Sequence, residues 1–171
     1  MIVMITGSKE YSDRAAVENW IDTLPPETVL ISAGSNTGPD AWARKRATAR
    51  GDITVETIKA EWQGPLDHTS GKIRNNRMIA RMLEIADPDK RLAAFLAKDP
   101  HGGWSENGKH AVTVARAAHI KVAIKPLAEE WQEPETVIGL PRITGENYQA
   151  PVASTFDLCG DDASEWLDEI P

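Results

Sequence analysis

Two stretches decide the fold: residues 1–9 read MIVMITGSK, and residues 28–40 read TVLISAGSNTGPD. Each has a short apolar run, then a loop that contains glycine, then a segment with the polarity of a helix. Glycine lets the backbone approach a ligand closely, and the first turn of the following helix presents unpaired N–H groups to an anion. The repeated unit therefore predicts a parallel sheet with a phosphate or nucleotide site at one edge.

Apolar runs of strand length recur along the first 125 residues, and helical segments alternate with them. The strands are expected at Ile2–Thr6, Thr28–Ser32, Ile53–Ile58, Arg91–Leu96 and Ile120–Ile124, and the helices at Asp13–Leu24, Pro39–Arg50, Ile73–Ala86 and Gly108–Ala118. Such alternation is typical of a parallel sheet covered on both faces by helices. We expect a Rossmann-like, doubly wound α/β domain of about five strands over residues 1–125, with its ligand loops at the carboxyl edge.

Residues 126–171 break this alternation and carry most of the negative charge. They hold eleven acidic residues and a single basic one, Arg142, whereas residues 1–125 hold eighteen basic and fifteen acidic residues. We expect an extended acidic arm that lies on its own domain or on a second copy of the chain, because short isolated elements are not stable alone. The body suits an anionic ligand, and the arm disfavours direct nucleic-acid binding.

Composition limits the class of protein. The chain has 171 residues, of which 41% are hydrophobic, and no apolar run approaches the roughly 20 residues of a membrane span. Its start lacks the basic region of a secretory signal. Cys159 is the single cysteine, and the four histidines show no spacing of metal ligands. We expect a cytoplasmic protein with no membrane partner, no disulfide within the chain and no metal.

The first two loops offer polar groups for a phosphate or a ribose. The candidate ligand-binding residues are Gly7, Ser8, Lys9 and Tyr11 in the first loop, and Gly34, Ser35, Asn36, Thr37, Gly38 and Asp40 in the second. Two glycines around three polar residues predict a nest of backbone donors. Asp40 can instead cap its helix, and the first loop can be a plain turn before Asp13. Neither GxGxxG nor GK[ST] occurs, so the sequence predicts no NAD, no ATP hydrolysis and no cofactor.

Cations cluster around a third loop and its helix. Lys72, Arg74 and Asn75 are candidate ligand-binding residues there, because a helix N-terminus and a guanidinium together attract an anion. Solvated surface charge is the alternative interpretation. Trp62 can stack on a base or simply cover the core. A long fourth loop over residues 98–107 contains glycines and has the composition of a lid, with Glu106 as its best-placed acid.

Taken in order, these segments resemble the YspA/YpsA-like branch of the SLOG superfamily, Rossmann-like proteins related to the LOG phosphoribohydrolases. The matching pieces, which fall within residues 1–125, are Thr6-Gly7-Ser8 with Lys9 and Tyr11, Gly34 with Gly38-Pro39-Asp40, Ala60-Glu61-Trp62, and Gly71-Lys72-Ile73-Arg74-Asn75 with Met78. The resemblance implies a nucleotide or nucleotide-derived ligand at the carboxyl edge. The LOG enzymes use a PGGxGTxxE loop, and residues 104–111 of this chain, WSENGKHA, lack its Gly-Thr pair and its trailing Glu.

Three functions follow as hypotheses. The first is binding of a nucleotide or phosphorylated nucleoside, for sensing, sequestration or processing. The second is an enzyme that cleaves or exchanges an N-glycosidic bond, as a glycosidase or deoxyribosyltransferase does. That reaction needs a carboxylate beside the sugar, for which Asp40, Glu61 and Glu106 are the candidate catalytic residues, with Lys72 or Arg74 holding the phosphate. The third is an interaction protein that acts through the acidic arm, including as a homo-oligomer.

Overall fold

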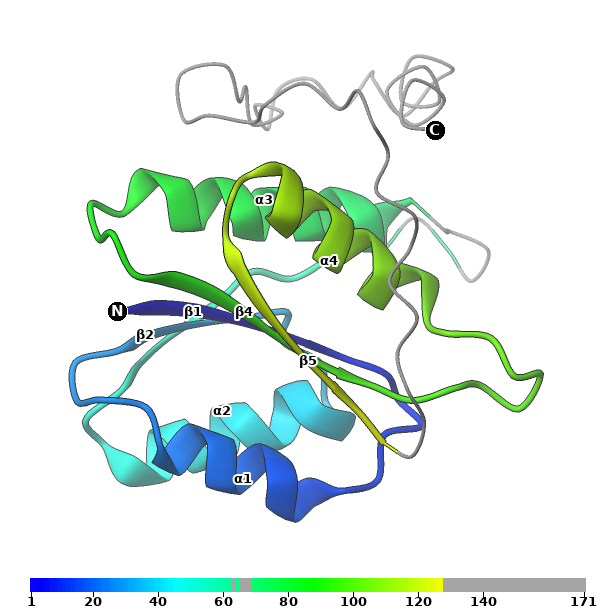
Figure 1. Cartoon of the computed structure of the whole chain (residues 1–171), viewed down its shortest axis with the longest axis horizontal. Helices are drawn as coiled ribbons and strands as arrows, with labels where there is room; N and C mark the ends of the chain where they lie inside the picture. The colour runs from blue at the N-terminus through cyan, green and yellow to red at the C-terminus, as the bar shows by residue number, and fades with distance from the viewer. Residues whose placement is uncertain (63, 65–68, 128–171) are drawn as a thin grey trace.

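The computed structural model describes residues 1–62, 64 and 69–127, so the expected arm lies outside the described residues apart from Pro126 and Leu127. Strands and helices alternate along the chain (Figure 1). In order they are β1 (Ile2–Gly7), α1 (Arg14–Asp22), β2 (Val29–Ser32), α2 (Gly38–Arg50), β3 (Thr54–Thr57), α3 (Ser70–Glu84), β4 (Lys90–Leu96), α4 (Glu106–Ala117) and β5 (Lys121–Pro126).

The strands form one parallel sheet in the order β3-β2-β1-β4-β5. Helices α1 and α2 cover one face, and α3 and α4 cover the other (Figure 1). This confirms the predicted α/β class with a doubly wound, five-stranded parallel sheet. The winding changes direction between β1 and β4, which is the place where ligands bind in sheets of this type.

The central strands are buried on both faces, and alternate residues enter two separate cores. Ile2 and Met4 of β1 pack with α3 and α4, whereas Val3 and Ile5 pack with α1 and α2. This period of two follows from the pleat of the strand. In the second core Phe95 is fully buried, and Tyr11 and Trp20 meet it edge to face at centroid distances of 5.5 and 5.6 Å.

Local signals explain where the helices begin and end. Asp13 caps α1 as predicted by accepting from the Ala16 N–H at 2.9 Å. Gly51 ends α2 in the left-handed conformation, with φ of 77°. Helix α3 starts three residues earlier than predicted, at Ser70, and α4 starts at Glu106, after Ser105.

The helices of the described ranges include none that is long and apolar enough to cross a membrane.

Candidate functional site

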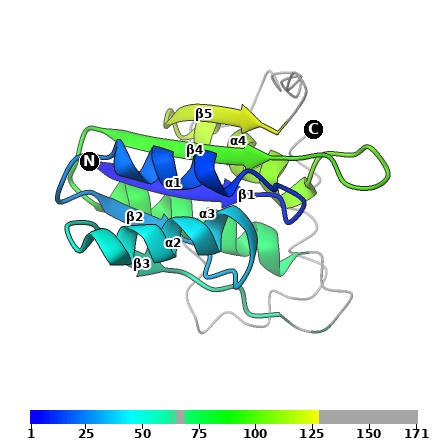
Figure 2. The ribbon, with the colours of Figure 1, turned by 90° about the horizontal axis from the view of Figure 1, so that it is seen from below.

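The loops that follow β1 and β2 lie against each other at the carboxyl edge of the sheet, toward which every strand points (Figure 2). A Cβ atom on Gly7 would lie 2.6 Å from Cγ of Pro39, so only glycine allows this approach. A Cβ on Gly38 would lie 3.5 Å from the carbonyl oxygen of Ser8. The two glycine loops predicted from the sequence are therefore neighbours in space.

In the first loop, Ser8 links the carboxyl ends of β1 and β4 through two hydrogen bonds. Its N–H donates to the carbonyl of Phe95 at 3.0 Å, and its Oγ accepts from the N–H of Ala97 at 3.0 Å. The side chain is buried, as is that of Tyr11, which belongs to the core. Burial raises the pKa of the Tyr11 hydroxyl. Of the residues predicted to bind a ligand in this loop, Lys9 alone presents an exposed side chain.

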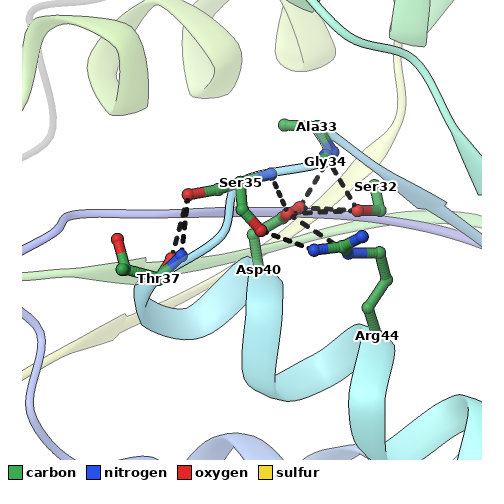
Figure 3. Close-up of polar contacts among 7 residues, drawn as sticks. All are labelled: Ser32, Ala33, Gly34, Ser35, Thr37, Asp40 and Arg44. Carbon is green, nitrogen blue, oxygen red and sulfur yellow. Dashed lines mark hydrogen bonds and ion pairs between the residues drawn. The ribbon is translucent and has the colours of Figure 1, made fainter.

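In the second loop, the carboxylate of Asp40 binds the loop backbone (Figure 3). It accepts from the N–H groups of Ala33 and Ser35, each at 2.8 Å, and from the hydroxyl of Ser32 at 3.0 Å. Arg44 lies one turn along α2, with its Nε 3.9 Å from the carboxylate and its Nη2 donating to the Ser35 carbonyl. Asp40 is 6% exposed, so this is a buried structural contact.

The backbone donors of the second loop are thus largely used within the loop itself. Besides the two that bind Asp40, the N–H of Gly34 donates to Oγ of Ser32 at 3.1 Å, and that of Thr37 donates to Oγ of Ser35 at 3.4 Å. The predicted nest of donors exists, but it holds a carboxylate of this chain. The side chains of Asn36 and Thr37 remain exposed at the tip of the loop.

Lys59 is a further residue at this edge that the sequence analysis did not single out. A Cβ on Gly34 would lie 3.0 Å from Cγ of Lys59, which shows that the lysine stem crosses the second loop. Lys59 follows the carboxyl end of β3, and this position in the sequence could have identified it as a residue of the carboxyl edge. Ser32 and Arg44 were also missed, because their role depends on the buried Asp40.

Helix α3 has an N-terminus unlike those of the other three helices. Asp13 caps α1, Asp40 occupies the first turn of α2, and α4 has Ser105 as its cap and Glu106 in its first turn. The first turn of α3 contains no acidic residue, and the side chain of Thr69, the N-cap residue, makes no capping hydrogen bond. The helix dipole gives this end a partial positive charge.

Arg74 begins the second turn of α3, and the charge of Asp40 acts on it. It is partly buried, its Nη2 donates to Oδ1 of Asn75 at 3.0 Å, and its Nε is buried without a hydrogen-bond partner in the described structure. Burial lowers the pKa of Arg74, and the negative charge of Asp40 opposes that shift, so the two side chains lie within electrostatic reach. Within the described ranges no carboxylate forms an ion pair with this guanidinium.

Asn75 connects α3 to α4. Its Nδ2 donates to the carbonyl of Asn107 at 2.8 Å, and its side chain is buried. Gly71 makes room for this contact, because a Cβ there would lie 2.6 Å from Oδ1 of Asn107. Asn75, predicted as a ligand-binding residue, is thus placed in a helix-to-helix contact.

The three candidate catalytic acids already have partners in the protein. Asp40 holds the second loop. Glu61 accepts from Nη1 of Arg77 at 2.9 Å, and Glu106 pairs with Lys109 on the surface. Trp62, beside Glu61, is 56% exposed and therefore available to stack on a planar group.

The fourth loop forms a hydrogen-bonded turn. Oδ1 of Asp99 accepts from the N–H groups of His101 and Gly103, at 2.8 and 2.9 Å. A β-bridge joins Lys98 to Trp104 at the base of the turn. These bonds lie within the segment that has the composition of a lid.

Comparison with known proteins does not place the chain in a family: no family model matches it, and no curated protein matches its sequence. Within the described ranges, no group of three or more His, Cys, Asp or Glu residues is arranged to hold a metal ion.

Proposed function

We propose that the protein binds an anionic ligand of the nucleotide class at the carboxyl edge, with the phosphate at the N-terminus of α3. The observation that carries this proposal is the state of Arg74, a partly buried guanidinium whose Nε lacks a hydrogen-bond partner. Buried polar groups of native proteins are nearly always paired. A phosphate oxygen accepts from such a group, and the positive end of a helix dipole also attracts its charge.

Electrostatics favour α3 over the other helix termini. A phosphate placed at the second loop meets the Asp40 carboxylate and competes for donors that this carboxylate already holds. A phosphate at α1 or α4 meets Asp13 or Glu106. At α3 it meets Lys72 and Arg74 instead, and both carry a positive charge.

The rest of the ligand is proposed from the resemblance to the SLOG proteins together with the exposed groups nearby. Trp62 offers an aromatic surface, and Asn36 and Thr37 offer hydrogen-bonding groups at the tip of the second loop. Aromatic stacking with a few polar contacts is a usual way to hold a nucleoside. Because the three candidate acids are engaged elsewhere, binding is favoured over N-glycosidic cleavage. The cytoplasmic location, the homo-oligomer and the role of the arm stay predictions.

Calorimetry with a panel of nucleoside mono-, di- and triphosphates tests the proposal. At least one member should bind, and at a concentration of a hundred times its Kd it should stabilise the protein by about 2.7 kcal/mol. Arg74→Gln should weaken that binding at least about tenfold, the loss of a charge-assisted contact.

Arg91→Gln is the matched control, since Arg91 pairs with Asp89 at the opposite edge of the sheet and should leave the affinity unchanged. Binding of the same strength in wild type and Arg74→Gln would contradict the proposed site. No binding of any nucleotide would contradict the proposed ligand class.

A further inference from the structure

One face of the edge strand β5 is uncovered. Val122 and Ile124 pack against the core that α3 and α4 cover. Lys121, Ala123 and Lys125 alternate with them, so they point to the other face, where they are exposed. Helix α1 lies over β1 and β4 on that side, and no helix of the described ranges lies over β5 (Figure 2). Strands of a parallel sheet are normally covered on both faces, so this face offers a place for a further segment.

The uncovered face of β5 combines apolar atoms with positive charge. Leu127 continues the alternation just beyond the strand and is 37% exposed. Phe95, the neighbour of Lys125 on β4, meets Trp20 of α1 at a centroid distance of 5.6 Å, which gives the face an aromatic border. Lys125 forms no ion pair among the residues that the structure describes. The side chain of Lys121 is 75% exposed and has a carboxylate oxygen no nearer than 3.8 Å. A segment that fits this face is apolar on one side and acidic beside it.

Residues 161–170 of the chain, which lie outside the described residues, have this character in their sequence, DDASEWLDEI. Their apolar members have the i, i+3, i+4, i+7 spacing of the apolar stripe of a helix: Ala163, Trp166, Leu167 and Ile170. The other members are acidic, apart from Ser164. A helix this short is not stable alone in water, so its apolar stripe needs a surface on which to pack.

We propose that residues 161–170 dock on the uncovered face of β5 in the same chain. The apolar stripe packs over Ala123 and Leu127, and the acidic side chains lie beside Lys121 and Lys125. Opposite charges favour this placement, because residues 126–171 hold eleven acidic residues and one basic residue. Residues 128–160 are long enough to reach any part of the strand, since an extended residue spans about 3.3 Å. The docking is independent of the anion site.

Two features of β5 disfavour a second copy of the strand as the occupant. Pairing of the open edges of two copies would bring the lysines of both onto one face of the joined sheet, where like charges repel. Pro126 ends the strand and has no N–H group to donate to a partner strand. The acidic segment is therefore favoured over self-association through this edge.

Cys159, the single cysteine, permits a direct test on the full-length chain. A nitroxide spin label on this residue, next to the proposed segment, weakens the NMR signals of amides close to it. We expect loss of amide signal in β5 and none at Thr54–Thr57 of β3, the opposite edge of the sheet. A mixture of spin-labelled chain with isotope-labelled chain that carries no spin label reports contacts between copies, and it should show no loss at β5.

Two pairs of variants test the apolar and the charged contacts. Trp166→Ser should restore the β5 signals, whereas Trp131→Ser, which removes the same side chain elsewhere in residues 128–171, should leave them weakened. Lys125→Glu should restore part of the signal, whereas Lys45→Glu, at an exposed position of α2, should not.

The wild-type measurement alone can overturn the inference. Full amide signals in β5 of the spin-labelled chain would show that the segment docks elsewhere or not at all. Loss of signal in the mixture would place a second copy on the strand. Equal loss in wild type and Trp166→Ser would show that the apolar stripe does not make the contact. Each of these results would leave the proposed anion site untouched.

Discussion

The variant Asp40→Ala tests whether the carboxylate of Asp40 stabilises the fold or is available for catalysis. The wild-type carboxylate accepts two backbone hydrogen bonds at 2.8 Å and one from the Ser32 hydroxyl at 3.0 Å, while it is 6% exposed. Each bond to a charged acceptor contributes about 1.5–3 kcal/mol, and the contributions are not additive. Arg44 makes its bond to the Ser35 carbonyl in both proteins, so that bond contributes nothing to the difference. We expect a net destabilisation of about 3 kcal/mol.

Urea denaturation followed by fluorescence measures this change as a lower midpoint at unchanged slope. The corresponding fall in Tm is about 6–12 °C for a chain of this length. Asp40→Asn should cost less than Asp40→Ala, because the amide oxygen still accepts one of the backbone bonds.

Asp22→Ala is the matched control. Asp22 also binds an arginine through two hydrogen bonds, to Arg46 at 2.8 and 2.7 Å, but the pair is exposed. Its loss should lower the denaturation midpoint far less than Asp40→Ala does, because solvent screens an exposed pair. If Asp40→Ala unfolds at the wild-type midpoint, the carboxylate does not hold the second loop, and our account of that loop is wrong.

Three further predictions concern the elements that build the site. Gly7→Ala should destabilise the protein by about 1–3 kcal/mol, because the new Cβ would lie 2.6 Å from Pro39. Ser8→Ala should cost about 1–3 kcal/mol, because the N–H of Ala97 loses its buried acceptor. Burial lowers the pKa of His110 in the folded protein to about 4, below its usual value of 6.5, so the neutral form stabilises the fold. That stabilisation, at most roughly 3 kcal/mol, is present above pH 6.5 and should be lost as the pH falls toward 4.

Each of the three has its own check. Denaturation midpoints test the glycine and serine variants, and Gly51→Ala is the control for Gly7→Ala, since a Cβ at Gly51 meets nothing within 4 Å and costs only the left-handed backbone strain. Equal destabilisation by Gly7→Ala and Gly51→Ala would show that the structure accommodates a Cβ beside Pro39 without a further loss of stability. The histidine prediction is tested by denaturation between pH 8 and 4, and an unchanged pH dependence in His110→Gln would contradict it.

The sheet could be predicted from the sequence because its signals are local. Apolar runs mark the strands, Asp13 and Gly51 mark helix ends, and the alternation implies parallel strands. The convergence of the first two loops also followed, since parallel strands end at one edge. The starts of α3 and α4 were misplaced, because Gly71 and Gly108 lie inside the helices, where close contacts explain them. Helices α1 and α3 also end earlier than predicted, at Asp22 and Glu84.

The sequence could not predict which group accepts from the backbone N–H donors of the second loop. That depends on which carboxylate reaches which N–H group in three dimensions. Asp40 follows the second loop in the sequence and resembles a ligand contact, yet it fills the nest that the glycines create. Lys72 and Arg74 are two residues apart on α3 and leave the helix in different directions, so the charge of Lys72 acts on His110 and the charge of Asp40 acts on Arg74. Tertiary packing, and not the local sequence, determines these side-chain partners.

A titration of isotope-labelled protein with sulfate, followed by backbone and arginine side-chain NMR signals, tests the central claim most directly. The account predicts that the amide of Gly71 and the Nε–H of Arg74 shift together and saturate, while the amides of Gly34 and Ser35 stay near their starting positions. Saturating shifts at Gly34 and Ser35, with Gly71 and Arg74 unmoved, would place the anion in the second loop and contradict the account.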